Sequence, residues 1–377
     1  MNIHSILKKE GIEIKSKLDT EQVSKIAQII SQKMNETFPE HNLSTTTLFE
    51  TLSRLDMYIA EMPNDAVAKY FYKNNSIYFS NQMNLDNLDT LVLHECLHAI
   101  QEIKSPRNKL LKLGLYDLTT NKGQGVNEAA VQLMATKDSQ VEPDFVKYYN
   151  MNFYTPSPLY YPIETALINQ LIYFTGSYPL FHSTLHSNNI FKNTFIAKCN
   201  EKIYNTIETN FDLLIYYEEQ LSMLFSELNS ISENTTNLNK IKKLNNKIAS
   251  TKSLILNTTI TTQNLIIEHC FEAEFEAIRD ASSLNHFQQR LYEFNELLIN
   301  TDSYRFYNSF YCEMMNRLDE KRKLIKEFGV LNYLNDLQTD LLDLERDHFG
   351  LTFFRRLFHK LKLLFEEAVR DKNNNNA

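Results

Sequence analysis

The sequence is poor in glycine and proline, with 7 and 8 of these residues in a chain of 377. Both residues mark turns, so their scarcity argues against a many-turned β-sandwich and favours long helices. A basic excess is also missing: the net charge is −8 at pH 7, whereas a general nucleic-acid binder normally has a basic face. No uncharged apolar run approaches about 18 residues, so we expect neither a transmembrane span nor a signal peptide.

Cysteines are few and scattered. The four of them form no CxxC pair and lie at Cys96, Cys199, Cys270 and Cys312. Such spacing is typical of reduced thiols in a reducing compartment, and with no leader the chain is expected to be cytoplasmic. The hydrophobic content of 43% and charged content of 23% are those of a globular protein.

Two kinds of segment follow one another in the first part of the chain. Residues 22–37 have the apolar spacing of an amphipathic helix. Three runs rich in aromatic and β-branched residues then predict strands at 56–62, 67–72 and 76–80, with a turn at Asn74-Asn75. We expect a small antiparallel sheet here, followed by an apolar helix over 87–104.

From about residue 207 the pattern becomes almost purely helical. Leu214, Leu221 and Leu228 recur every seven residues, which predicts a coiled-coil-like hairpin within the chain rather than a dimer. A basic amphipathic stretch at 353–369 is expected to dock on its own domain and not on a membrane surface. The overall prediction is a mainly α (α+β) protein, with one domain over 1–205 and a helical domain over 206–377.

The segment LVLHECLHAI at 91–100 has polar residues in the middle of an apolar helix. His94 and His98 are four residues apart, so both face one side of the helix, with Glu95 beside the first. A helix so apolar should be buried, and two buried imidazoles need partners. This HExxH arrangement predicts a Zn²⁺ site in which Glu95 takes a proton from the water bound to the metal.

A catalytic zinc usually has three protein ligands, and the two histidines leave one to be found. The segment GQGVNEAAVQLMA at 123–135 resembles the thermolysin-type gluzincins, the HExxH zinc metallopeptidases whose third ligand is a glutamate opening a later helix. The resemblance covers about residues 55–135 and rests on Gly125, Asn127, Glu128 and Ala129. It implies a zincin-like catalytic domain with Glu128 as third ligand and an edge strand that pairs with a peptide substrate. Gln132 stands where thermolysin has an aspartate that orients a histidine.

Other residues remain open as ligands or catalytic groups. Asp117, Glu102 and Asp138 are the alternatives to Glu128. Zincins commonly add a tyrosine or histidine that donates to the oxyanion, and Tyr161 is the predicted donor, with Tyr160 beside it. His182 and His186 repeat the i, i+4 spacing, but with no carboxylate or cysteine near them in sequence we read them as helix-surface histidines.

The sequence therefore predicts a zinc-dependent metallopeptidase that acts on a peptide or protein substrate and binds no nucleic acid. His94, His98 and Glu128 are the predicted metal ligands, and Glu95 is the predicted general base. The alternative is a catalytically silent zincin-fold scaffold or peptide-binding protein. In either case the zinc site is expected to be built wholly within residues 1–205.

Overall fold

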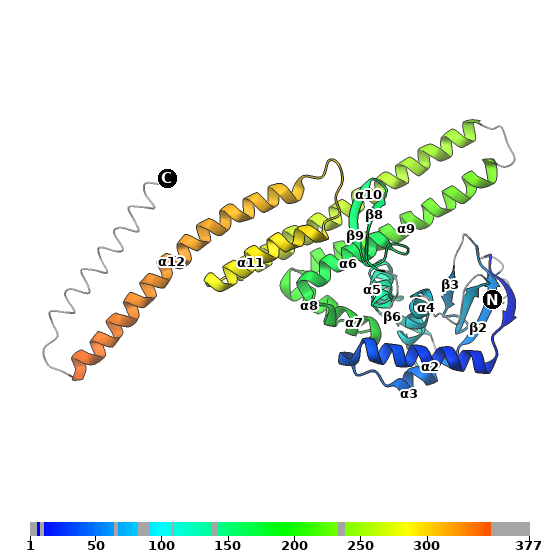
Figure 1. Ribbon diagram of the computed structural model, residues 1–377, viewed down its shortest axis with the longest axis horizontal. Coiled ribbons are helices and arrows are strands. Elements are labelled where there is room, and N and C mark those ends of the chain that lie inside the picture. The colour runs from blue at the N-terminus through cyan, green and yellow to red at the C-terminus, as the bar shows by residue number, and fades with distance from the viewer. Residues whose placement is uncertain are drawn as a thin grey trace. The chain divides into compact units, whose positions relative to one another are not determined.

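A computed structural model gives the fold of the 377-residue chain (Figure 1). The residues it describes are 6–7, 11–63, 67–81, 90–107, 109–137, 142–232 and 238–347. The chain divides into two compact units. The first comprises Met1–Ala273 with Phe294–Tyr304, and the second Glu274–Glu293 with Arg305–Ala377. The predicted domain boundary near residue 205 concerns independent folding and stays a prediction.

The largest sheet lies in the N-terminal part of the first unit. Its strand order is β1-β2-β4-β3, from Glu13–Lys17, Asp56–Glu61, Ser76–Ser80 and Ala68–Phe71. The three strands predicted from sequence are therefore present. The sheet is mixed and not antiparallel as expected, because β2 and β4 run parallel. The turn between β3 and β4, with Asn75 at a φ of 57°, puts β3 on the outer edge and returns β4 beside β2.

Helix α2 (Thr20–Thr37) covers the span predicted for an amphipathic helix. It begins with a capping box in which Asp19 accepts from the Gln22 backbone N–H and the Gln22 side chain accepts in return. Val23, Ile26 and Ile30 are buried along one stripe. The short turn η1 (Pro39–His41) and helix α3 (Thr45–Leu52) follow.

Helix α4 (Thr90–Ile100) carries the HExxH segment and ends earlier than predicted. Residues 102–104 form strand β5 (Glu102–Lys104), which pairs with β6 (Leu110–Leu113), and β6 pairs with β7 (Tyr116–Asp117). The prediction of a helix through Lys104 is therefore wrong. The Ser187 hydroxyl donates to the Gln101 carbonyl where the helix stops. The backbone of the residues that follow pairs with β6 instead of continuing the helix.

Helix α5 (Gln124–Thr136) packs on α4. A hairpin of β8 and β9 and three helices follow it in sequence. Their bounds are Asp144–Tyr148, Met151–Thr155, Pro162–Thr175 for α6, Ser177–His186 for α7 and Ile190–Lys198 for α8. Both α6 and α9 pack directly on α5.

Helices α9 (Glu201–Ser232) and α10 (Leu238–Glu276) form the long hairpin visible in Figure 1. The Lys240 ammonium pairs with the Glu227 carboxylate over 3.3 Å across the two helices. The helical hairpin predicted from the heptads is therefore present. Leu214 and Leu221 are buried, and Leu228 is partly buried.

The described residues of the second unit include helices α11 (Ala281–Glu293) and α12 (Phe306–Asp347), while η3 (Phe294–Leu297) belongs to the first unit. The predicted amphipathic stretch at 353–369 lies outside the described residues. Among those described, no helix is long and apolar enough to cross a membrane. The protein is mainly helical, with small sheets in its N-terminal half, as the sequence predicts.

Candidate metal centre

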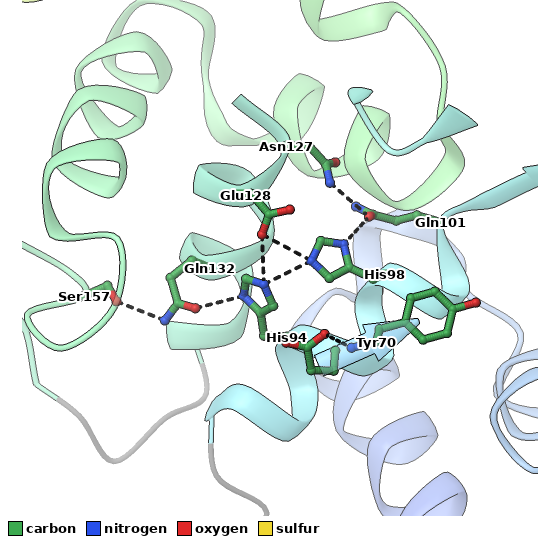
Figure 2. Close-up of polar contacts among 9 residues, drawn as sticks. Tyr70, His94, His98, Gln101, Asn127, Glu128, Gln132 and Ser157 are labelled. Carbon is green, nitrogen blue, oxygen red and sulfur yellow. Dashed lines mark hydrogen bonds and ion pairs between the residues drawn. The ribbon is translucent and has the colours of Figure 1, made fainter. Parts of the chain in front are cut away.

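Helices α4 and α5 bring three ligand atoms to one point (Figure 2). His94 and His98 lie one turn apart on α4, and their Nε2 atoms are 3.0 Å from each other. Glu128 reaches them from α5, with Oε2 at 3.2 Å from His94 Nε2 and 3.3 Å from His98 Nε2. Within the part of the chain that the structure describes, this is the one group of three His, Cys, Asp or Glu residues close enough to hold a metal ion.

The spacing of these atoms fits a small tetrahedral cation. Zinc bonds of about 2.0–2.1 Å at tetrahedral angles place neighbouring ligand atoms about 3.3 Å apart. The three separations here are 3.0, 3.2 and 3.3 Å. Two imidazoles and one carboxylate also form the donor set of a catalytic zinc that keeps a fourth position open. The residues present therefore fit a divalent metal such as Zn²⁺.

The electrostatics of the site favour one added positive charge. Burial disfavours the imidazolium form of His98, but the Glu128 carboxylate, together with Glu95 and Gln101, raises the pKa of His98 to about 9. Burial likewise opposes ionisation of Glu128, yet the two histidines hold the pKa of this carboxyl far below its usual range. A proton or a metal cation can supply the charge that these three side chains attract.

A buried chain of hydrogen bonds fixes the ring of His94. Its Nδ1 donates to Gln132 Oε1 over 2.9 Å, and Gln132 Nε2 donates to Ser157 Oγ over 2.9 Å (Figure 2). The Ser157 hydroxyl donates in turn to the Tyr160 carbonyl. Because the Ser157 hydroxyl hydrogen is used in this bond, the Ser157 oxygen accepts from Gln132. This fixes the Gln132 amide with its oxygen toward His94. His94 Nδ1 is then protonated and its Nε2 lone pair faces the site.

His98 is oriented in the same way from the other side. Its Nδ1 lies 3.3 Å from Gln101 Oε1, and Asn127 Nδ2 donates to that oxygen over 3.4 Å. The Leu115 backbone N–H donates to Asn127 Oδ1 and so fixes the Asn127 amide. Both histidines therefore turn their Nε2 atoms toward Glu128, each because an amide oxygen holds its Nδ1 hydrogen.

Glu95 lies beside the ligand group and not in it. Its Oε2 accepts from the Tyr70 backbone N–H over 2.5 Å, which ties the carboxylate to strand β3. Glu95 is only 9% exposed, so this link to the strand is largely shielded from water. Its neighbour Cys96 is fully buried on the core side of α4, as expected of a small apolar residue.

Tyr161 lies against the ligand group at the start of α6. Its ring stacks on the His94 ring with centroids 5.9 Å apart and an interplanar angle of 13°. Tyr161 has a left-handed backbone with φ of 51°, and Pro162 follows as the first helical residue. Burial, with Glu128 and Glu95 nearby, raises the pKa of its phenol well above the ordinary value, so the hydroxyl stays protonated and can donate.

The helix that carries Glu128 is held at its N-terminus by α9. The Asp212 carboxylate accepts from the backbone N–H groups of Gly123 and Gly125 over 3.0 and 2.8 Å. A Cβ on Gly125 would lie 2.2 Å from the Phe211 carbonyl oxygen, so only glycine permits this approach of the two helices. A residue beyond 205 thus caps the ligand-bearing helix, which the sequence did not reveal.

The other predicted ligands are not brought to this centre. The Asp117 carboxylate is taken up by Thr119 and Thr120 in its own turn. Glu102 accepts from the Tyr70 hydroxyl over 2.7 Å and pairs with Lys104. Asp138 lies outside the described residues. His186 is exposed, as expected of a surface histidine, whereas His182 is partly buried and stacks on His41 and Tyr178.

Comparison with known proteins gives no match. No family model, no curated protein and no solved structure is significantly similar to this chain. The chemistry of the three ligand side chains and their neighbours is therefore the basis for a function.

Proposed function

We propose that this protein is a zinc-dependent metallopeptidase. The observation that carries the proposal is the convergence of His94, His98 and Glu128, with the Glu95 carboxylate beside them and tied to an edge strand. Three ligands with one position left open suit catalysis better than structure, since structural zinc sites usually have four protein ligands.

The donor set favours zinc among the common metals. Two imidazoles and one carboxylate suit Zn²⁺, while Mg²⁺ and Ca²⁺ prefer oxygen donors alone. When bound, Zn²⁺ supplies the Lewis acidity that activates water and polarises a carbonyl. The amides of Gln101 and Gln132 support this role because they keep both Nε2 lone pairs directed at the ion.

The side chains around the ligands have the chemistry that amide hydrolysis requires. Glu95 is placed to accept a proton from the attacking water and to deliver it to the leaving amine. Tyr161, whose phenol remains protonated, is the donor that we assign to the developing oxyanion. Among the described residues strand β3 pairs with β4 alone, and we propose that an extended peptide lies along its other edge, where Glu95 accepts from the Tyr70 N–H.

The test combines metal analysis with one isosteric substitution. We expect one zinc per chain in the wild type and its loss in His94→Ala and His98→Ala. His186→Ala removes an exposed histidine of the same i, i+4 type and should keep the metal. Glu95→Gln should also keep zinc and fold, while hydrolysis of a peptide-library substrate falls by about 10²–10⁴-fold.

Three results would each remove part of the proposal. Protein that takes up no zinc after reloading has no metal centre, and the peptidase assignment ends there. Protein that binds zinc but cleaves peptides equally well with Glu95→Gln has a different mechanism. Zinc binding without any cleavage by the wild type would favour the silent scaffold instead.

A further inference from the structure

Two glutamates outside the metal centre lie next to each other, one of them buried and the other partly buried. Glu164 lies in the first turn of α6 and Glu218 on α9, and Glu164 is 0% exposed. The two carboxyl groups are close enough to share a proton in a hydrogen bond. Apart from Glu218, the Glu164 oxygens have no hydrogen-bond partner among the described residues. A buried carboxyl pair without a cationic partner is costly and calls for a proton or another positive charge.

A cavity opens at Glu218, the more exposed member of the pair. Its volume is about 420 Å³, and its walls include Glu218, Tyr148, Tyr149 and Phe225. The Tyr149 hydroxyl donates to the Tyr148 hydroxyl over 3.1 Å, which joins the two rings of the β8–β9 hairpin. Acidic and aromatic groups thus line one space large enough for a side-chain-sized ligand.

The aromatic walls already attract a cation. The Lys252 ammonium lies 5.2 Å from the centroid of the Phe225 ring and 5.8 Å from that of Tyr149. Rings of this kind bind ammonium and guanidinium groups through their negative faces. Carboxylate and aromatic walls therefore select the same class of ligand.

We propose that this cavity binds an organic cation, an alkylammonium or a guanidinium, with Glu218 backed by Glu164 as its anionic partner and Tyr149 and Phe225 as its aromatic walls. The binding site itself is independent of hydrolysis. Its meaning as a substrate subsite rests on the proposed peptidase function, and it then selects peptides with lysine or arginine side chains.

The position of Tyr161 connects the cavity with the metal centre. Tyr161 stacks on His94. The pKa of its phenol is raised by the charges of the ligand Glu128 and of the pair Glu164 and Glu218, in addition to burial. Glu164 follows Tyr161 on the same first turn of α6. A cation held by the pair is thus within electrostatic reach of the group that we assign to the oxyanion.

Binding of a cation should expel a proton. Burial raises the pKa of Glu164 to about 7, although its hydrogen bond with Glu218 acts in the opposite direction. Burial and the neighbouring Glu164 carboxyl raise the pKa of Glu218 well above the usual range. Among the described residues, the phenols of Tyr148, Tyr149 and Tyr161 also face the pair and are neutral at this pH. The Lys252 ammonium lies on the aromatic walls of the same cavity. Because the cation prefers the ionised carboxylate, its binding tightens as the pH rises through 7.

The experiment is calorimetric titration of the full-length protein with butylguanidinium chloride, with 1-butanol as the uncharged probe. We expect binding of the cation and not of the alcohol, with proton release seen as a dependence of the heat on buffer ionisation enthalpy. Glu218→Gln should weaken binding by about tenfold or more. Glu227→Gln, an exposed residue of the same helix outside the cavity lining, removes the same charge and should leave binding unchanged.

The outcomes are decisive without an activity assay. Absence of cation binding, equal loss in Glu218→Gln and Glu227→Gln, or uptake of Ca²⁺ in place of butylguanidinium would each overturn the proposal. Should Glu218→Gln fail to fold, the two probes and the pH dependence in wild type still decide. A failure to bind the cation would not contradict the proposed zinc binding and hydrolysis. Protein stripped of zinc should bind the cation as tightly as protein with zinc.

Discussion

Replacing Gln132 by methionine tests how the centre is held together. The side chain keeps its length but loses the amide oxygen that accepts from His94 Nδ1 over 2.9 Å. Gln132 is 1% exposed, so water cannot readily replace the lost acceptor. The imidazole N–H is left without a partner, and the ring is free to turn its Nε2 away from Glu128.

The expected effect follows from that hydrogen bond. Leaving a buried donor unsatisfied costs about 1–3 kcal/mol. Loss of the partner that orients a metal-binding histidine lowers metal affinity by about 10–100-fold, or roughly 1.4–2.7 kcal/mol. The two estimates agree, so we expect the zinc affinity of Gln132→Met to fall between ten- and a hundredfold.

The assay is competition for zinc against a chelator of known affinity. Gln132→Glu restores an acceptor and should bind zinc at least as well as the wild type. Gln263→Met is the matched control, because Gln263 is equally buried but bonds the Ile299 backbone and no residue of the metal centre. Unchanged zinc affinity in Gln132→Met, or an equal loss in Gln263→Met, would refute the role given to Gln132.

Three further results are expected. Gly125→Ala should lower stability by about 1–3 kcal/mol and weaken zinc binding, because its Cβ would meet the Phe211 carbonyl at 2.2 Å. Gly329→Ala, where a Cβ meets open space, should do neither in the same melts and titrations. In urea melts of the metal-free protein, stabilisation by the His98 imidazolium should be fully present below pH 6.5, the ordinary pKa of the group. The free energy of unfolding should fall by on the order of 3 kcal/mol as the pH rises through about 9, and His98→Ala should not show this fall. A fragment ending near residue 205 should fail to bind zinc, in contrast to the sequence-based expectation, since it lacks Asp212.

Local patterns made the metal centre partly predictable. The i, i+4 spacing alone puts His94 and His98 on one face of a helix, and the apolar residues around them require burial. Both statements depend on the helix period and not on the rest of the fold. Glu128 was predicted by resemblance only, because nothing local fixes how α5 lies against α4.

The positions of strands were predictable where aromatic and β-branched residues cluster, as in β2, β3 and β4. Their pairing was not. Whether β4 lies parallel or antiparallel to β2 depends on where the β3–β4 hairpin folds, and the sequence of the hairpin is compatible with both arrangements. The end of α4 was also missed, because Leu110–Leu113, which pairs with β5, is not adjacent in sequence.

The contribution of α9 to the site could not be predicted from the sequence. Asp212 occurs within a heptad-bearing helix, where a charged residue normally faces solvent. Its carboxylate instead meets the N-terminus of α5, some ninety residues earlier in the chain, and offsets the partial positive charge of that helix end. Only the close approach permitted by Gly125 makes this possible. Glu218, two turns further along α9, faces inward as well and meets Glu164. Helix α9 therefore contributes to both the candidate metal centre, through Asp212, and the cavity, through Glu218.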